Sequence, residues 1–427
     1  MSLNLGLAPS LWQQTATKPP KFNQLSGDIT ADVTIIGAGF TGLRAALELV
    51  QKGVDVVVLD SYEPGWGASG RNGGQVNPMA HSTPEEIIQQ LGPVYGPRML
   101  ESYANSANEL FQVVKQHDLK CEAAQNGWLR GAHCRSAAKT IEKMSKGWAA
   151  AGLDIDLVEG EELHRLTGSS AYDVATRVKS GGNVQPLSYA RELARVAHEK
   201  GARIYTNSKV QQYHKHGDKW RVVSASGSVS SEWVIFCTNG YTENTLKGLK
   251  QTIVPLVSVQ AATRLLSDEE YSRVLPEGHT LSDSRRVVYY TRKDHRGRLV
   301  FGSMGRVEGC AISDKKRLQN GLKQVFPQFS ADDLEFYWGG RLAITTDHLP
   351  HLHEPASGIL AGLGYNGRGV AMATVMGRIL SERVLGKRTE DLAIPSTPFK
   401  SFRLKPFHQL GMPIAIKYFE LRDSLDV

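Results

Sequence analysis

Cysteine is scarce in this sequence, and its occurrences share no pattern. Cys121, Cys134, Cys237 and Cys310 are far apart in a chain of 427 residues, and none of them stands in CxxC spacing. Folds that depend on disulfides need a much denser set of cysteines. The sequence therefore predicts reduced thiols in a reducing compartment.

Long apolar runs are also missing. No stretch approaches the roughly 18 apolar residues that a membrane-spanning helix needs. Residues 1–20 contain no basic residue before Lys18 and no long apolar core, which excludes a typical secretory signal peptide. We therefore expect a cytoplasmic protein without a transmembrane segment.

Basic residues are numerous but dispersed. The formal net charge is +7 and the sequence pI is about 9.1, yet Lys and Arg form no run of five or more. We expect no nucleic-acid partner, because a bound dinucleotide and a substrate with a carboxylate would explain the surplus. The sequence contains no convincing GxSxG, Walker A or HExxH motif.

A strand, a helix and a second strand are expected near the N-terminus. Residues 32–36 form a short β-branched run that is typical of a buried parallel strand. Apolar residues at i, i+3, i+4 and i+7 from Leu43 predict an amphipathic helix. A second buried strand over residues 54–59 ends at Asp60. This is the start of a βαβ fold.

The turn between the first strand and the helix carries GxGxxG at Gly37, Gly39 and Gly42. The first glycine permits a tight turn, the second lets the backbone approach a pyrophosphate, and the third lets helix and strand pack closely. The helix N-terminus favours the anion, and Asp60 would accept hydrogen bonds from ribose hydroxyls. The pattern predicts a dinucleotide-binding Rossmann unit.

Two further glycine-rich segments favour FAD over NAD. Residues 65–74 follow the acid directly and can lie along a long cofactor, with backbone donors and Arg71 for a phosphate. Residues 364–369, GYNGRG, lead into a helix that we expect to end near residue 385. The free N–H groups of such a turn suit the negative charge of a reduced flavin.

The length predicts two packed domains, because 427 residues exceed what one core usually supports. We expect an α/β fold, with a Rossmann-type FAD-binding domain and an interleaved α+β substrate domain. The predicted ranges are 30–85, 146–245 and 341–400 for FAD binding, 86–145 for a helical insertion, 246–340 for the sheet of the substrate domain, and 401–427 for a tail.

With these motifs in place, the chain resembles the D-amino acid oxidase superfamily of FAD-dependent amine and amino acid oxidases. The resemblance covers nearly the whole length, with ADVTIIGAGFTGLRAALEL at 31–49, GASGRNGGQ at 67–75, GYNGRG at 364–369 and the tail at 418–423. The loop and the tail are most similar to gamma-glutamylputrescine oxidases. Residues 347–349, together with GYNGRG, also resemble bacterial L-pipecolate oxidases.

The resemblance implies hydride transfer from the carbon beside a nitrogen to flavin, after which the imine hydrolyses to a carbonyl and an amine. It also implies a cofactor site. The family's ADP-binding positions fall on Gly37, Ala38, Gly39, Phe40, Thr41, Gly42 and Asp60, and its flavin and pyrophosphate loop falls on Ser69, Gly70, Arg71 and Asn72. The adenine contact falls on Val210, and the small-residue turn falls on Thr238 and Gly240. The turn beside the isoalloxazine ring falls on Gly367, Arg368 and Gly369.

The chain departs from the sarcosine-type oxidases of this superfamily at three places. The slot of their flavin-bonding cysteine holds Gly340, and residues 345–347 replace a Thr-Pro-Asp segment, so non-covalent FAD is expected. Their oxygen-activating lysine aligns with Val300. The electron acceptor is therefore O2 or another acceptor, and oxidase and dehydrogenase both stay open.

Three residues are candidates for contact with substrate: Arg341, Arg368 and Tyr289. Arg341 is close to where amino acid oxidases place a carboxylate-binding arginine, and Arg368 lies in the flavin turn. Tyr289 and Tyr290 are candidates for the pocket wall. The competing interpretation is an ordinary ion pair for each arginine and packing for each tyrosine.

A histidine-rich run at residues 347–354 has metal-ligand chemistry. Pro350 and the loop-like setting give it no fixed face, and the family that the chain resembles uses no metal there. We therefore expect no metal site.

The substrate stays open at this point. The resemblance favours a gamma-glutamylated polyamine, with L-pipecolate or another secondary or N-methyl amino acid as the alternative. An NAD-dependent dehydrogenase would need only the first motif and would be colourless. A flavin-containing binding protein would be yellow but never reduced by amines.

Overall fold

The computed structural model describes residues 9–401 and 408–425, so parts of the predicted tail lie outside the described residues. A six-stranded sheet runs in the order β19-β20-β13-β2-β3-β9. Its inner strands are β-branched runs buried on both faces, as a parallel sheet between layers requires. Its strands are β2 (Val33–Ile36), β3 (Val56–Leu59), β9 (Arg203–Tyr205), β13 (Trp233–Phe236), β19 (His351–Ala356) and β20 (Ile359–Leu363).

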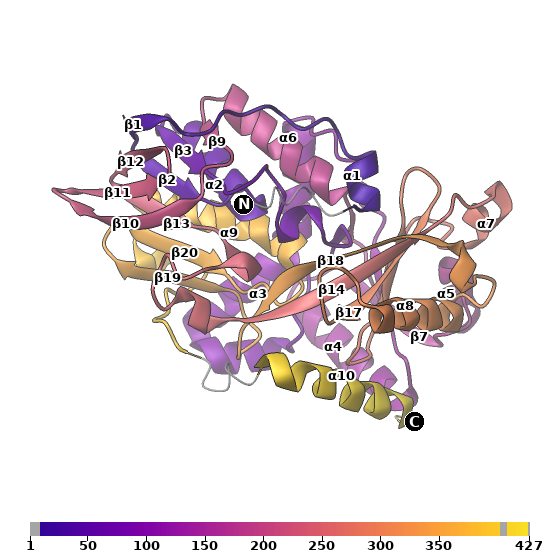
Figure 1. Cartoon of the computed structure of the whole chain (residues 1–427). Coiled ribbons are helices and arrows are strands. Elements are labelled where there is room, and N and C mark those ends of the chain that lie inside the picture. The colour runs from indigo at the N-terminus through magenta and orange to yellow at the C-terminus, as the bar shows by residue number, and fades with distance from the viewer. Residues whose placement is uncertain (1–8, 402–407, 426–427) are drawn as a thin grey trace.

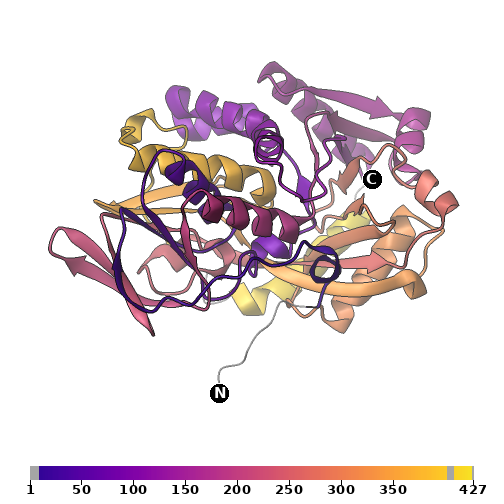
Figure 2. The ribbon, with the colours of Figure 1, turned by 90° about the horizontal axis from the view of Figure 1, so that it is seen from above.

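Four helices pack around this sheet. Helix α2 contacts both α6 and α9, and α9 also contacts α3, as the view from above shows (Figure 2). All four share one apolar cluster with β2 and β3. Helix α3 therefore packs with the six-stranded unit, although residues 86–145 were expected in the substrate domain. The helices are α2 (Phe40–Val50), α3 (Pro84–Gln116), α6 (Pro186–Glu199) and α9 (Gly369–Val384).

An eight-stranded sheet forms the second unit, in the order β18-β14-β17-β16-β15-β5-β7-β6 (Figure 1). A second apolar cluster lies between this sheet and α8 (Ile312–Val325). The strands are β5 (Trp128–Gly131), β6 (Ile155–Glu159), β7 (Val174–Val178), β14 (Val254–Thr263), β15 (Thr280–Asp283), β16 (Tyr290–Lys293), β17 (Leu299–Gly305) and β18 (Leu334–Ile344).

Four strands differ in position from the sequence prediction. β5 lies inside the predicted helical insertion, and β6 and β7 lie inside residues 146–245, which were expected to bind FAD. All three belong to the eight-stranded sheet because Trp128 of β5 pairs with Thr280 and with Val178 of β7, and β6 pairs with β7 on its other side. The strand predicted at 287–291 begins instead at Tyr290.

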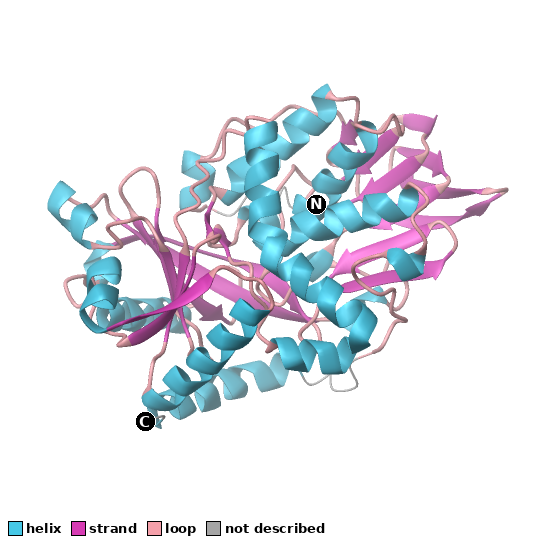
Figure 3. Ribbon diagram, turned by 180° about the vertical axis from the view of Figure 1, so that it is seen from behind, coloured by secondary structure: helices cyan, strands magenta, loops and turns pink. Residues whose placement is uncertain are grey.

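Smaller elements complete the two units. Figure 3 shows that many of the helices lie between the two sheet regions. Asp423 of the last helix accepts bonds from Arg286 and from the Val287 amide, 2.9 Å each, which fastens that helix to the eight-stranded unit. None of the described helices is long and apolar enough to cross a membrane. These elements are β1 (Gly27–Thr30), β10 (Val210–His216), β11 (Lys219–Ser224) and β12 (Gly227–Ser231) in one sheet; β4 (Gln75–Val76) and β8 (Gly182–Asn183) in another; and α1 (Leu11–Thr15), α4 (Arg135–Ala150), α5 (Gly160–Thr167), α7 (Asp268–Arg273), α10 (His408–Leu425), η1 (Ala68–Gly70), η2 (Asn239–Tyr241), η3 (Leu249–Thr252), η4 (Ala331–Asp333) and η5 (Thr389–Asp391).

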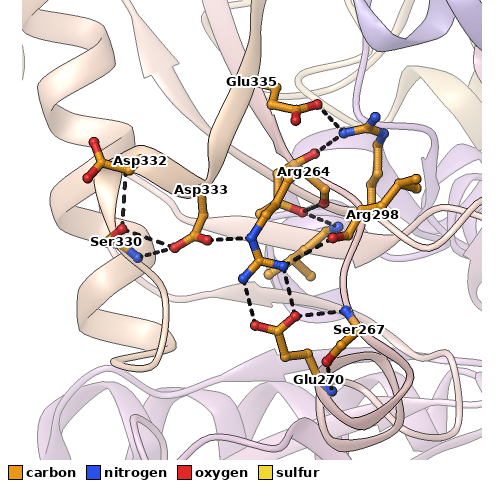
Figure 4. Close-up of polar contacts among 11 residues, drawn as sticks. Arg264, Ser267, Glu270, Arg298, Ser330, Asp332, Asp333 and Glu335 are labelled. Atoms are coloured by element: carbon orange, nitrogen blue, oxygen red, sulfur yellow. Dashed lines mark hydrogen bonds and ion pairs between the residues drawn. The ribbon is translucent and has the colours of Figure 1, made fainter.

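A charged network holds one corner of the eight-stranded unit together (Figure 4). Arg264, just after β14, donates to Glu270 of α7 at 2.7 Å and to Asp333 of η4 at 2.8 Å. Arg298 donates to Glu335 at 2.6 Å. Hydrogen bonds from Arg264 lower the pKa of Glu270 to about 2. These groups compensate one another, so the network connects elements and leaves no charge available for a ligand.

Candidate cofactor and substrate site

One cavity of about 1430 Å³ is lined by residues from both large sheets. Pockets for a single small ligand usually measure roughly 300–1000 Å³. The lining begins at the ends of β2 and β3 and continues to β14, β16 and the turn at residues 364–369. The space therefore suits a long cofactor together with a second ligand.

The three glycines of the first motif each have a neighbour closer than 3.0 Å to where a Cβ would lie. Gly37 has φ +111°, and a Cβ there would lie 2.7 Å from the Cys237 carbonyl oxygen. A Cβ on Gly39 would lie 2.9 Å from Ser69 Oγ, and one on Gly42 would lie 2.0 Å from the Gly37 oxygen. The close approaches are those that a dinucleotide-binding turn needs.

Helix α2 begins at this turn with its N-terminus at the cavity. Gly39 is the N-cap and offers no side-chain cap, while the Phe40 amide donates to Ser69 Oγ at 3.0 Å. Ala38 and Thr41 line the same wall. Amide donors and the positive end of the helix dipole together suit a pyrophosphate.

Asp60 lies at the end of β3 and faces the cavity. Its carboxylate accepts the Ala38 amide at 2.6 Å and the Tyr62 amide at 2.9 Å. Burial raises the pKa of Asp60 to about 6 despite these bonds. Hydroxyl donors from a ribose would stabilise the ionised form, which is the chemistry expected of this position.

The loop at residues 65–74 is fixed rather than flexible. Arg71 is 7% exposed and donates through Nε to the Trp66 carbonyl at 2.8 Å. Trp338 donates to the Arg71 carbonyl at 3.0 Å, and Trp12 to the Asn72 carbonyl at 2.8 Å. Indole donors from two distant segments therefore hold the loop in place.

The turn at residues 364–369 is joined to the turn after β13. Asn239 Oδ1 accepts the Gly364 amide at 3.0 Å, and Asn366 Oδ1 accepts the Thr345 amide at 2.9 Å. Gly364 and Gly367 both have φ +81°, a conformation that favours glycine. Arg368 is the N-cap of α9, so this second helix also begins at the cavity.

The structure brings most of the predicted cofactor residues together around this cavity. Gly42 and Gly70 are outside the lining and pack behind it, against Gly37 and Gly65. The residues that line it are Gly37, Ala38, Gly39, Phe40, Thr41, Asp60, Ser69, Arg71, Asn72, Val210, Thr238, Gly240, Gly367, Arg368 and Gly369.

The slot predicted to lack a flavin-bonding cysteine is sterically closed. A Cβ on Gly340 would lie 2.8 Å from Arg71 Cβ. Among the described residues no group of three His, Cys, Asp or Glu side chains could hold a metal. In the histidine-rich run, His351 bonds Asp347 at 2.9 Å, and His353 is 2.6 Å from the Thr397 carbonyl.

The two predicted tyrosines point to different places. Tyr290 lines the cavity, and its hydroxyl lies 2.6 Å from both Ser258 Oγ and Gln260 Nε2. Tyr289 is not in the lining and packs on Phe301, with ring centroids 5.5 Å apart. The geometry therefore gives no support to substrate contact by Tyr289.

Arg341 lines the cavity but already has a carboxylate partner. Its side chain is 52% exposed and forms an ion pair with Glu308. Glu308 also faces Arg71 at 3.7 Å and accepts the Tyr241 hydroxyl at 3.1 Å. The charge that could bind a substrate carboxylate is thus largely neutralised.

Arg368 differs from Arg341 in this respect. It is 9% exposed, donates through Nε to the Met79 carbonyl at 2.7 Å, and lies over the Trp128 ring at 5.1 Å. Arg130, which sequence reasoning missed, lines the cavity nearby from β5. No sequence signal marks Arg130, because it lies in a stretch predicted to be helical.

Two glycine turns that begin helices at one long cavity, with an acid at the end of the second strand, define a dinucleotide-binding protein. A family model described as FAD dependent oxidoreductase matches residues 32–383. The chain belongs to this family, and FAD is its cofactor.

Several known proteins are similar to the chain over nearly its whole length. A probable oxidoreductase OrdL of Rhizobium meliloti is 30% identical, over 97% of each chain. The gamma-glutamylputrescine oxidoreductase of Escherichia coli is 29% identical, over 98% of this chain and 99% of its own. The solved glycine oxidase of Geobacillus kaustophilus superposes with a TM-score of 0.72 at 19% identity, over 88% of this chain and 99% of its own. The protein is an enzyme that oxidises C–N bonds of amines or amino acids.

Proposed function

We propose that the enzyme oxidises the amine of a gamma-glutamylated polyamine. The observation that carries the proposal is a cavity that continues past the cofactor loops to two arginines, Arg130 and Arg368, neither of which has a carboxylate within ion-pair distance among the described residues. A gamma-glutamylated amine carries a carboxylate at one end and the oxidisable amine at the other. The similarity to gamma-glutamylputrescine oxidoreductase supports the same substrate class.

The residues of the chain divide the work between holding the cofactor and orienting the substrate. FAD supplies the hydride acceptor. We propose that the α2 N-terminus and Arg71 hold the pyrophosphate, that Asp60 binds the ribose, and that the Gly367–Gly369 turn lies beside the flavin ring. Tyr290, fixed by its hydroxyl bonds, forms a rigid part of the cavity wall.

The test is the anaerobic visible spectrum of the holoenzyme before and after gamma-glutamylputrescine is added. Bleaching of the flavin band is expected, with free putrescine as the matched control that lacks the glutamyl group. If L-pipecolate or N-methyl amino acids bleach the flavin and gamma-glutamylputrescine does not, the proposed substrate is wrong. Readmitting air then distinguishes an oxidase, whose band returns, from a dehydrogenase.

A further inference from the structure

We propose that Arg130 and Arg368, with His81 beside them, form a subsite that binds a substrate carboxylate. The inference rests on the proposed function only for the name of the substrate. The chemistry of the subsite, two guanidinium groups facing one cavity, calls for a carboxylate whichever amine is oxidised.

Charge compensation separates these two arginines from the others in the cavity. Every other arginine of the lining has a carboxylate within ion-pair distance, whereas no described acid lies that close to Arg130 or Arg368. A cationic group removed from water without a partner is costly, so a ligand anion fits here. The compensated pairs are Arg71 with Glu308, Arg285 with Asp283, Arg286 with Asp423, and Arg341 with Glu308.

The two guanidinium groups approach the cavity from the same side. Trp128 and Arg130 stand two residues apart on β5, so their side chains share one face of the strand. Arg368 lies over the Trp128 ring at 5.1 Å, which brings it to that face. Burial is the main cause that lowers the pKa of Arg368, and the positive charge of Arg130 is the second cause. An anion between the two would relieve both effects.

Hydrogen bonding leaves most of the donors free for a ligand. Arg368 uses Nε for the Met79 carbonyl, and within residues 9–401 and 408–425 neither of its terminal nitrogens has an acceptor. Among the described residues, the one hydrogen-bond acceptor of the Arg130 side chain is the Met144 sulfur, 3.4 Å from Nη1. Several N–H groups are therefore available for the two oxygens of a carboxylate.

His81 borders the subsite without adding charge. Its Nε2 lies 2.9 Å from the Asn366 carbonyl, which can only accept, so Nε2 carries the proton. The charge of Arg368 holds the pKa of His81 well below its usual range. Its Nδ1 is then an acceptor, which suits the ammonium beside the α-carboxylate of a glutamyl group.

The experiment titrates the holoenzyme with pentanoate and with pentanamide, its neutral isostere, and follows flavin absorbance and thermal unfolding. Neither probe carries an oxidisable amine, so binding is measured without turnover. We expect the wild-type enzyme to prefer pentanoate. Arg130→Gln should weaken pentanoate binding by about 10- to 100-fold, the size of a lost charge-assisted bond, and leave pentanamide unchanged. Arg130→Lys should restore part of the preference.

Arg341→Gln is the matched control, because Arg341 lines the same cavity but is paired with Glu308. Its preference for pentanoate should match that of the wild type. Equal binding of the two probes by the wild type, or loss of the preference in Arg341→Gln but not in Arg130→Gln, would overturn the subsite. A retained preference without bleaching by gamma-glutamylputrescine would instead refute only the proposed substrate.

Discussion

Asp60 gives the most direct quantitative test of the cofactor site, because its ionisation and FAD binding are coupled. Without cofactor, burial raises the pKa of this carboxyl to about 6, from an ordinary value of 3.8. A raised folded-state pKa means that the apoprotein loses stability as pH rises from about 4 to about 6. The full loss is about 3 kcal/mol, at 1.36 kcal/mol per pKa unit.

The cofactor should reverse this behaviour. Ribose hydroxyls donate more strongly to the ionised carboxylate than to the protonated carboxyl, so bound FAD lowers the pKa of Asp60 and its binding releases a proton. The affinity for FAD is therefore expected to rise with pH, by up to about tenfold per pH unit, and to level off above pH 6. Fluorescence titration of the apoprotein with FAD between pH 5 and pH 8 measures the slope.

The variant Asp60→Asn separates this coupling from general effects of pH. An asparagine oxygen can accept from the Ala38 or the Tyr62 amide, but its NH2 group faces the other donor. We expect about 10- to 100-fold weaker FAD binding at pH 8 and no slope below pH 6. Asp28→Asn, on the exposed strand β1, is the control. A flat profile in the wild type, or an unchanged slope in Asp60→Asn, would refute the reasoning.

Two further predictions concern the same cofactor. Acid precipitation of the holoenzyme should leave all the flavin in the supernatant, because Gly340 leaves no thiol at the attachment slot; flavin in the washed pellet would contradict this. Gly42→Ala would place a methyl group 2.0 Å from the Gly37 carbonyl oxygen. This substitution should lower the free energy of unfolding by about 1–3 kcal/mol and abolish FAD retention during purification. A variant that purifies yellow with unchanged thermal unfolding would contradict this prediction and show that the turn can relax.

The cofactor half was predictable because its signals are local. The strand, turn, helix and acid that bind a dinucleotide follow one another between residues 32 and 60, and each has a simple physical requirement. The loop at residues 65–74 comes directly afterwards. The eight-stranded sheet was harder, because β5 pairs with β15 and β7, whose positions depend on contacts far along the chain.

The tyrosine pair shows why the prediction of a strand does not by itself identify a residue that contacts substrate. The strand expected at 287–291 contained both Tyr289 and Tyr290, which were therefore equal candidates for the pocket wall. The observed β16 begins at Tyr290. Neighbouring residues of a strand point to opposite faces. Tyr290 meets the cavity and Tyr289 the apolar core; which of the two faces the cavity is decided by the packing of the sheet, which the sequence pattern does not show.

Which residues can bind the substrate depends on how charges are compensated in the folded protein, and no single segment of the sequence shows this. Arg341 was a strong candidate by position, but Glu308, from another part of the chain, is its partner. No sequence motif marks Arg130, yet it shares the cavity with Arg368 and has no described acid within ion-pair distance. The charge of an arginine is most available to a substrate carboxylate where the fold brings no acidic side chain to it. That condition, set by long-range packing, selects Arg130 and Arg368 over Arg341 as the residues whose exchange should change carboxylate affinity.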